Sequence, residues 1–316
     1  MLKAALVGVG GISGAHIPAW DNMEDTELVA LCDIRPERME NYSDKHCYTD
    51  FDEMLKNEKI DILDICLPTY LHADFAIKAM DLGINVISEK PISLKEEDVK
   101  RVYDAAKRNN VKFMVAQVLR FWPEYEFVKE LYENKKYGKL LSGSMERLGS
   151  IPKWSWDNWM GDEKRSGLVP YDLHVHDLDF MIYAFGLPVN VKSNRSKSEK
   201  ADVIHAVYEF DDFFVSADAT WYNAPYPFTA SYRFQFEHAV VVKGAEDLTV
   251  YEDNGNIIKV GDGEEVKGDT GSINLPKSNA YANEIRYFTD CVENEVQADK
   301  IKPAELETVI KILNNL

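Results

Sequence analysis

The chain has 316 residues, 45% of them hydrophobic and 28% charged, which is typical of a globular protein large enough for two domains. Its net charge of −18 disfavours phosphate backbones and anionic lipid as partners. No stretch approaches the roughly 20 apolar residues of a membrane span, no signal peptide precedes the first predicted strand, and the four cysteines form no CxxC pair. We therefore expect a cytoplasmic protein that binds neither nucleic acid nor membrane.

The first 120 residues alternate between predicted strands and helices. Strands are expected at 2–8, 28–32, 60–67, 84–88 and 112–118, and helices at 13–22, 36–46, 70–82 and 95–109. Strands separated by helices form parallel sheets with right-handed crossovers. The sequence therefore predicts an α/β domain with a doubly wound parallel sheet over residues 1–120.

The first predicted strand leads into "GVGGISGAH" at residues 8–16, which has the spacing of a dinucleotide-binding turn. Gly8 permits the tight turn, and Gly10 lets the backbone approach a pyrophosphate at the N-terminus of the following helix. Asp33 ends the second strand, where an acidic side chain accepts hydrogen bonds from a ribose 2′-hydroxyl. A glycine turn in an unrelated α/β domain is the alternative, but this context favours a Rossmann domain.

Asp33 also bears on which cofactor is bound. A carboxylate beside a 2′-phosphate would repel it, so we expect NAD rather than NADP. Arg35, two residues later, could instead accept a phosphate, but a solvated charge at a helix start is the simpler interpretation.

Two further strands end in polar residues at the carboxyl edge of the predicted sheet, where ligands of open α/β sheets bind. One strand is followed by Pro68, Thr69 and His72, and the next by Glu89 and Lys90. Lys90 is a candidate proton donor or hydroxyl clamp, although an exposed strand-end lysine is the more common arrangement. The residues expected to bind the cofactor are Gly8, Gly10, Gly11, Ile12, Asp33, Pro68, Thr69, His72 and Glu89.

From about residue 121 the pattern changes to alternating, aromatic and β-branched runs. After a helix at 123–135, strands are expected near 139–149, 189–195, 202–210, 213–222, 228–237 and 239–252, a loop at 261–276, and helices at 279–295 and 303–315. This pattern predicts an α+β domain over residues 121–316. Its large, mostly antiparallel sheet is expected to carry a helix at 171–185 on one face and to leave the other face open.

The stretch "YDLHVHDLDF" at 171–180 places two histidines and three aspartates on that predicted helix. Asp172 and His176 are four residues apart and share one face, which Asp179 continues. His174 lies about 200° round the helix from His176, so the two imidazoles do not easily reach one ion. Spacing alone leaves open a metal site, a proton-transfer site or a core helix with polar side chains.

In combination these motifs resemble the Gfo/Idh/MocA oxidoreductase family, which includes glucose–fructose oxidoreductase and inositol dehydrogenases. The matching segments are "GVGGISGAH" at 8–16, "CDIRPER" at 32–38, "LPTYLH" at 67–72, "SEKPISL" at 88–94, "LRFWPEY" at 119–125 and "SGLVPYDLHVHDLDF" at 166–180. The resemblance implies that Lys90, Asp172 and His176 form the catalytic set, and it implies no metal. It also implies a cis peptide bond before Pro91, and a homodimer or homotetramer that assembles through the open sheet face.

The resemblance implies hydride transfer between a nicotinamide and a secondary alcohol or ketone of a sugar, cyclitol or related polyol. An ordinary imidazole, with a pKa of about 6.5, suits proton transfer at neutral pH, so His176 would accept the hydroxyl proton. Asp172 would orient the substrate or the imidazole, and Lys90 would stabilise charge on the same oxygen. Whether Lys90 or His176 takes the proton stays open. Two other functions are considered: an NAD-binding sensor without turnover, and an enzyme that recycles bound NAD for glycoside cleavage.

Two local features concern the substrate pocket. His174 stands where the family usually has a small residue, and a hydrogen-bonded core histidine is a simpler interpretation than a second base. "KWSWDNWM" places Trp154, Trp156 and Trp159 in a loop before the catalytic helix, where they would either contact a sugar ring or pack under the loop.

Overall fold

The computed structural model describes residues 1–244, 248–260 and 279–316. The chain divides into two compact units, one of Met1–Val118 and Glu265–Glu307 and the other of Leu119–Glu264 and Thr308–Leu316, so far as these ranges are described. The functional division into 1–120 and 121–316 stays a prediction, and the loop predicted at 261–276 lies outside the described residues.

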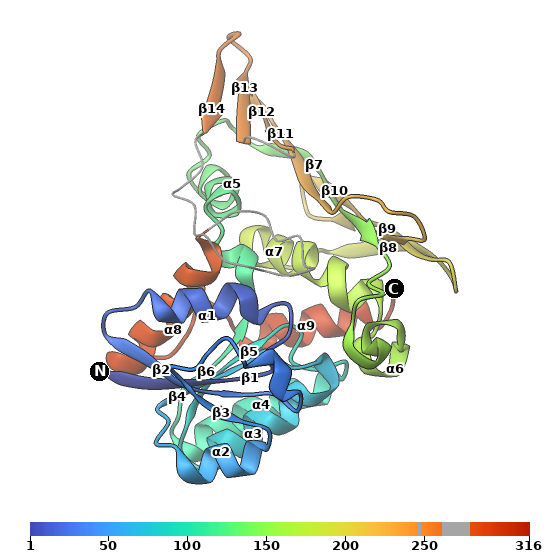
Figure 1. The fold of residues 1–316 in the computed structure, drawn as a ribbon. Coiled ribbons are helices and arrows are strands. Elements are labelled where there is room, and N and C mark those ends of the chain that lie inside the picture. The colour runs from blue at the N-terminus through green and yellow to red at the C-terminus, as the bar shows by residue number, and fades with distance from the viewer. Residues whose placement is uncertain (245–247, 261–278) are drawn as a thin grey trace. The chain divides into compact units, whose positions relative to one another are not determined.

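The first unit is built on a parallel sheet (Figure 1). Its strands are β1 (Leu2–Val7), β2 (Thr26–Cys32), β3 (His46–Tyr48), β4 (Ile62–Ile65), β5 (Asn85–Glu89) and β6 (Phe113–Ala116). They follow the order β3-β2-β1-β4-β5-β6, and every neighbouring pair is parallel. This is the doubly wound order of dinucleotide-binding domains, and the predicted parallel sheet is confirmed.

Helices cover both faces of this sheet (Figure 1). Helices α1 (Ser13–Asp21) and α8 (Ala280–Glu293) lie on one face, and α2 (Phe51–Asn57), α3 (His72–Met80) and α4 (Glu96–Asn109) lie on the other. All four residues of β4 and of β6 are buried, as expected for strands covered on both sides. Short 3-10 turns, η1 (Pro36–Arg38) and η2 (Thr69–Leu71), precede β3 and α3.

The helix predicted at 36–46 is wrong: only η1 forms there, and it is followed by the short strand β3. Met39 is the one buried side chain between 34 and 45, so this segment has no apolar face to pack. Its asparagine, serine and aspartate residues favour turns over helix. Strand β3 and helix α2 were not predicted, because neither carries a clear apolar period.

The second unit is built on an eight-stranded sheet (Figure 1). Its strands are β7 (Leu140–Ser150), β8 (Asn190–Ser198), β9 (Ala201–Glu209), β10 (Phe214–Tyr222), β11 (Thr229–Phe236), β12 (Ala239–Lys243), β13 (Leu248–Glu252) and β14 (Ile257–Val260). The order is β14-β13-β12-β11-β7-β10-β9-β8, and β7 with β10 is its one parallel pair among the described strands. The predicted mostly antiparallel sheet is confirmed, although the strand expected at 239–252 is two strands and β14 was not expected.

Two helices pack on one face of this sheet, α5 (Pro123–Asn134) and α7 (Val175–Phe185), and the π-helical turn η5 (Pro170–His174) precedes α7 (Figure 1). Rings from both helices and from the sheet, including Tyr125, Phe180 and Phe234, form the core between them. No described helix covers the opposite face, where side chains such as Ser144 and Val207 are only half-buried. The remaining helical segments are η3 (Val118–Phe121), η4 (Trp156–Gly161), α6 (Glu163–Ser166) and α9 (Pro303–Leu313).

None of the helices in the described ranges is long and apolar enough to cross a membrane.

Candidate active site

The turn after β1 has the features that a pyrophosphate-binding loop needs. Gly8 has a φ of +95°, and a Cβ there would lie 2.6 Å from the carbonyl oxygen of Cys66, so no other residue fits. A Cβ at Gly10 would meet no atom within 4 Å, so the loop borders open space at that position. Gly11 and Ile12 are half-buried and lead into α1, whose first turn contains no acidic residue. The positive end of the helix dipole is therefore available to an anion.

Asp33, after β2, holds this loop and a neighbouring arginine at once. One oxygen of its buried carboxylate, Oδ2, accepts the backbone N–H of Val9 at 2.9 Å. The guanidinium of Arg35 donates to both carboxylate oxygens, at 3.0 and 3.1 Å. The interpretation of Arg35 as a solvated charge is therefore wrong: this arginine is ion-paired beside the expected ribose position.

The residues after β4 form a braced turn. Thr69 is buried and Pro68 is half-buried. The ring nitrogens of His72 lie 2.8 Å from the carbonyl oxygen of Pro91 and 2.6 Å from that of Leu67, and burial lowers the pKa of this imidazole. His72 thus connects the turns that follow β4 and β5. Contact between these three residues and the cofactor stays a prediction.

The segment that follows β5 is held by Glu89, the last residue of that strand. The Lys90–Pro91 peptide bond is cis, which confirms that expectation. Glu89 is buried, and its Oε2 accepts the backbone N–H of Lys90 at 3.0 Å. Lys90 itself is partly buried rather than fully exposed.

A buried polar cluster behind this motif was missed in the sequence. The Nδ1 of His16, in α1, lies 2.8 Å from Oδ2 of Asp64, and its Nε2 lies 3.0 Å from Oε1 of Glu89. The indole N–H of Trp20 donates to the same Asp64 oxygen at 2.8 Å. Two signals pointed to this cluster: a histidine just after the glycine turn, and an aspartate inside the apolar run "DILDIC".

In the second unit, the helical stretch 171–180 exposes only two of its ten residues. Asp172 and His176 are partly exposed, whereas the other eight are buried. The predicted carboxylate–histidine face therefore exists, and it is the only accessible part of the stretch. Asp172 lies in the π-helical turn and His176 in the first turn of α7. Such π-turns frequently occur at functional sites.

The other two aspartates of the stretch are structural. Asp177 receives the guanidinium of Arg147, at 2.8 Å to Oδ1, and burial raises its pKa. Asp179 receives Arg120 through two hydrogen bonds of 2.8 and 2.6 Å, with both side chains fully buried. The expectation that Asp179 continues the face of Asp172 and His176 is therefore wrong, because its side chain is buried against Arg120.

His174 is a core residue, as expected. Its ring is fully buried, and Nε2 lies 2.6 Å from the hydroxyl oxygen of Tyr208. Burial lowers the pKa of His174 to about 3, so the ring is neutral at physiological pH. A second catalytic base at this position is not supported by these contacts.

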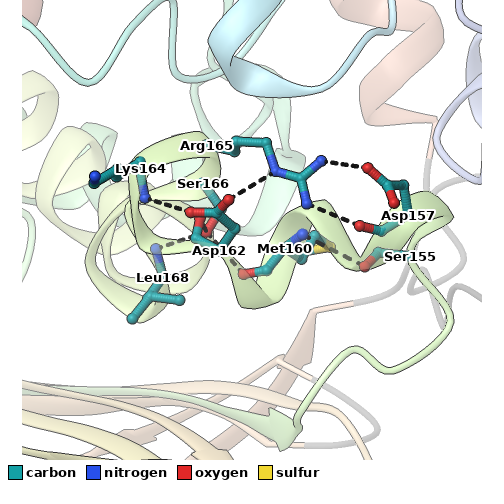
Figure 2. A network of polar contacts seen from close by, with 8 residues as sticks. All are labelled: Ser155, Asp157, Met160, Asp162, Lys164, Arg165, Ser166 and Leu168. Atoms are coloured by element: carbon teal, nitrogen blue, oxygen red, sulfur yellow. Dashed lines mark hydrogen bonds and ion pairs between the residues drawn. The ribbon is translucent and has the colours of Figure 1, made fainter.

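A polar network shapes the loop that precedes η5 (Figure 2). Arg165 donates to the Asp162 carboxylate at 3.0 Å and to a carboxylate oxygen and the carbonyl oxygen of Asp157, both at 2.8 Å. Asp157 and Asn158 have φ values of +49° and +48°, a conformation that costs energy in residues other than glycine. The contacts of Arg165 hold this strained turn in place.

The same network fixes the entry to η5 and α7 (Figure 2). Leu168 also has a positive φ, +61°, and its N–H donates to Oγ of Ser166 at 3.0 Å. The carbonyl oxygen of Leu168 in turn accepts the N–H of Asp172 at 2.9 Å. On the same loop Trp154 and Trp156 are 48% and 40% exposed. The loop therefore presents two aromatic side chains just before Asp172 in the chain.

Two family comparisons cover most of the chain. Residues 2–117 match the sequence model of an oxidoreductase family with an NAD-binding Rossmann fold. Residues 125–246 match that of the GFO/IDH/MocA C-terminal domain. The chain belongs to the Gfo/Idh/MocA oxidoreductase family. Its first unit accordingly contains an NAD-binding Rossmann domain.

Similar proteins agree with this membership. An uncharacterised oxidoreductase of Streptococcus pneumoniae is 30% identical over 190 residues, which are 59% of this chain and 51% of that protein. The D-apiose dehydrogenase of Paraburkholderia graminis is 28% identical over 188 residues, 58% of this chain and 50% of that protein. The matches thus span about half the length of these curated relatives. The structure of a levoglucosan dehydrogenase in complex with NADH and levoglucosan has the same fold, with a TM-score of 0.83 at 20% identity over 99% of this chain and 95% of that chain.

Proposed function

We propose that this family member transfers a hydride between NAD and a secondary alcohol or ketone of a sugar, cyclitol or related polyol. The observation that carries the proposal is the face of Asp172 and His176, the two accessible side chains of an otherwise buried helical stretch. Two relatives support the substrate class by their names, D-apiose dehydrogenase and levoglucosan dehydrogenase. The exposed faces of Trp154 and Trp156 support it too, since aromatic rings suit the C–H surfaces of sugars.

The first unit fits the cofactor. Gly10 borders open space at the start of α1, where the pyrophosphate would bind, and Asp33 would contact the ribose from the end of β2. Gly8, Gly11 and Ile12 would complete the loop, with Pro68, Thr69, His72 and Glu89 at the neighbouring strand ends. When bound, NAD supplies the acceptor for the hydride that leaves the carbinol carbon.

The proton of the substrate hydroxyl is transferred by side chains of the protein. His176 accepts the hydroxyl proton as the carbon–oxygen double bond forms, and the proton then passes to solvent. Asp172, one turn earlier, orients the substrate hydroxyl or the imidazole. Lys90 donates a hydrogen bond to the same substrate oxygen and stabilises the charge that develops there. In the reverse direction these groups return the proton to the alkoxide.

Asp33 is proposed to favour NAD over NADP. Asp33→Ala should shift the ratio of NADPH to NADH dissociation constants toward NADPH by roughly tenfold, or about 1.4 kcal/mol. Two effects act together, because the variant removes a charge that repels a 2′-phosphate and frees the guanidinium of Arg35 to bind it. Fluorescence titration with each reduced cofactor measures the ratio.

A matched double variant separates these two effects. Asp33→Ala with Arg35→Met should keep only the part of the shift toward NADPH that comes from removing the Asp33 charge, and lose the part that comes from the freed guanidinium. Melting temperatures control for the Val9 hydrogen bond that both variants lose. An unchanged ratio in folded Asp33→Ala would remove this carboxylate from the choice of cofactor.

Formation of NADH by the purified protein in the presence of a polyol tests the proposed function. Protein that binds NADH but oxidises no polyol would instead support the non-catalytic sensor.

A further inference from the structure

The buried cluster around His16 joins three parts of the first unit. His16 lies on α1, the helix that begins at the glycine loop, and its side chain is fully buried. One ring nitrogen contacts Asp64 on β4 at 2.8 Å, and the other contacts Glu89 at the end of β5 at 3.0 Å. A single imidazole therefore connects the two neighbouring strands whose ends carry the predicted site residues.

The connection continues from Glu89 into the backbone of Lys90. Glu89 uses Oε1 toward His16 and Oε2 toward the N–H of Lys90, the latter at 3.0 Å. Both carboxylate oxygens are thus engaged, which restricts rotation of the side chain. Asp64 is held through one oxygen, Oδ2, which contacts His16 and also accepts the indole N–H of Trp20, each at 2.8 Å.

A protonated ring at His16 offsets part of the carboxylate charge in the cluster. The groups that face His16 are Asp64 and Cys66 at the end of β4, Glu89 on β5 and the ring of Tyr281 on α8, 5.6 Å away. Burial lowers the pKa of His16, but Asp64 and Cys66 outweigh it, so the pKa lies well above its ordinary value. A protonated ring donates from both nitrogens, which matches its two carboxylate contacts.

We propose that His16 is a positioning residue, which orients the Glu89 carboxylate and through it the backbone at Lys90. The proposal rests on the proposed function, because Lys90 matters for activity only if it acts on the substrate oxygen. Without the ring, two buried carboxylates would lack their shared cation, and one would have to rotate, hydrate or take up a proton. Rotation of Glu89 would release the N–H of Lys90 from its acceptor, and hydration or protonation of the Glu89 carboxylate would weaken that hydrogen bond.

A metal ion is the competing occupant of this cluster, since His16, Asp64 and Cys66 present ligand atoms within 4.8 Å of one another. The contacts favour hydrogen bonds instead. The Nδ1–Oδ2 separation of 2.8 Å is a hydrogen-bond length. The same oxygen already accepts the indole N–H of Trp20, and the partly positive hydrogen directed at that oxygen would repel a cation. Stoichiometric zinc in the purified protein would overturn the proposal.

The test compares His16→Gln with His46→Gln in the full-length chain. Glutamine keeps a polar group but cannot carry the charge. His46 is a matched control because its imidazole also contacts a carboxylate, that of Glu58 at 2.7 Å, but is largely exposed. Four quantities are measured for each protein: amide hydrogen exchange at Lys90, the NADH dissociation constant, the melting temperature, and kcat and KM for polyol oxidation.

In His16→Gln we expect exchange at Lys90 to rise about tenfold, as its amide loses a charged acceptor. We expect kcat to fall roughly 100-fold, the scale of a small misplacement in an active site. KM for the polyol should stay within about twofold, since the change concerns the reacting geometry. The NADH dissociation constant reports separately on the cofactor contact proposed for Glu89. His46→Gln should match the wild type in all four quantities.

Unchanged exchange at Lys90 together with unchanged kcat, in folded His16→Gln, would contradict the proposal. If His16→Gln does not fold, Asp64→Asn gives the same test, because it removes the carboxylate that holds the ring. Faster exchange at Lys90 in a protein whose wild type oxidises no polyol would support the positioning role and reject the proposed function. The positioning role of His16 and the proposed function can therefore be rejected independently of each other.

Discussion

Replacing Lys90 by methionine should lower kcat for polyol oxidation by about 1,000-fold or more. Methionine fills a similar volume but neither donates a hydrogen bond nor carries charge. The substrate oxygen would then lose the group proposed to stabilise it. The NADH dissociation constant should change little, because the residues proposed to hold the cofactor are the glycine loop and Asp33. Steady-state kinetics and NADH fluorescence titration measure the two effects.

Lys95→Met is the matched control for this prediction. Lys95 lies five residues later and is exposed, so its loss should leave both kinetics and cofactor affinity unchanged. Loss of NADH binding in Lys90→Met, with an unchanged melting temperature, would assign Lys90 to the cofactor site. Full activity in Lys90→Met would remove it from the mechanism.

Replacing Arg120 by methionine should lower the free energy of unfolding by about 3–5 kcal/mol, because the change leaves Asp179 buried without its cation. Both side chains are fully buried, and their two hydrogen bonds hold α7 to the segment before α5. The Arg120 guanidinium also packs over the ring of Tyr183, 4.9 Å from its centroid. Urea denaturation followed by circular dichroism measures the change.

Two further variants define this effect. Arg101→Met removes a half-exposed arginine that is also paired with aspartates. It should lower the free energy of unfolding by no more than about 1 kcal/mol. Arg120→Met combined with Asp179→Leu should recover much of the loss, because no unpaired charge then remains buried. If Arg120→Met lowers the free energy of unfolding by no more than Arg101→Met does, the ion pair of Arg120 and Asp179 does not anchor α7.

Both sheets could be predicted from the sequence because the strands of each sheet have a distinct hydrophobic pattern. Buried parallel strands appear as short apolar runs between helices, and the half-covered antiparallel sheet appears as alternation. Segments without a clear period were predicted poorly. The polar run at 36–46 offers only Met39 for burial, so it forms a turn and a short strand instead of the predicted helix.

The candidate site was predictable where its chemistry is local. Asp172 and His176 share a face by spacing alone, and the glycine turn is continuous in sequence. Partners that are distant in sequence were not visible: Arg120 lies 59 residues from Asp179, and Glu89 lies 73 residues from His16. Such pairs depend on which elements become neighbours in the fold, so the ion pair of Asp179 with Arg120 and the cluster around His16 were not predicted.

Assembly through the uncovered face of the second sheet stays a prediction.

The most direct test of the proposed function is the nicotinamide absorbance of NADH when purified protein and NAD are mixed with a panel of inositols, hexoses and sugar acids. We expect NADH to form with at least one polyol, and we expect this signal to be absent from Lys90→Met. No NADH formation across the panel, from protein that binds NADH, would contradict the dehydrogenase function.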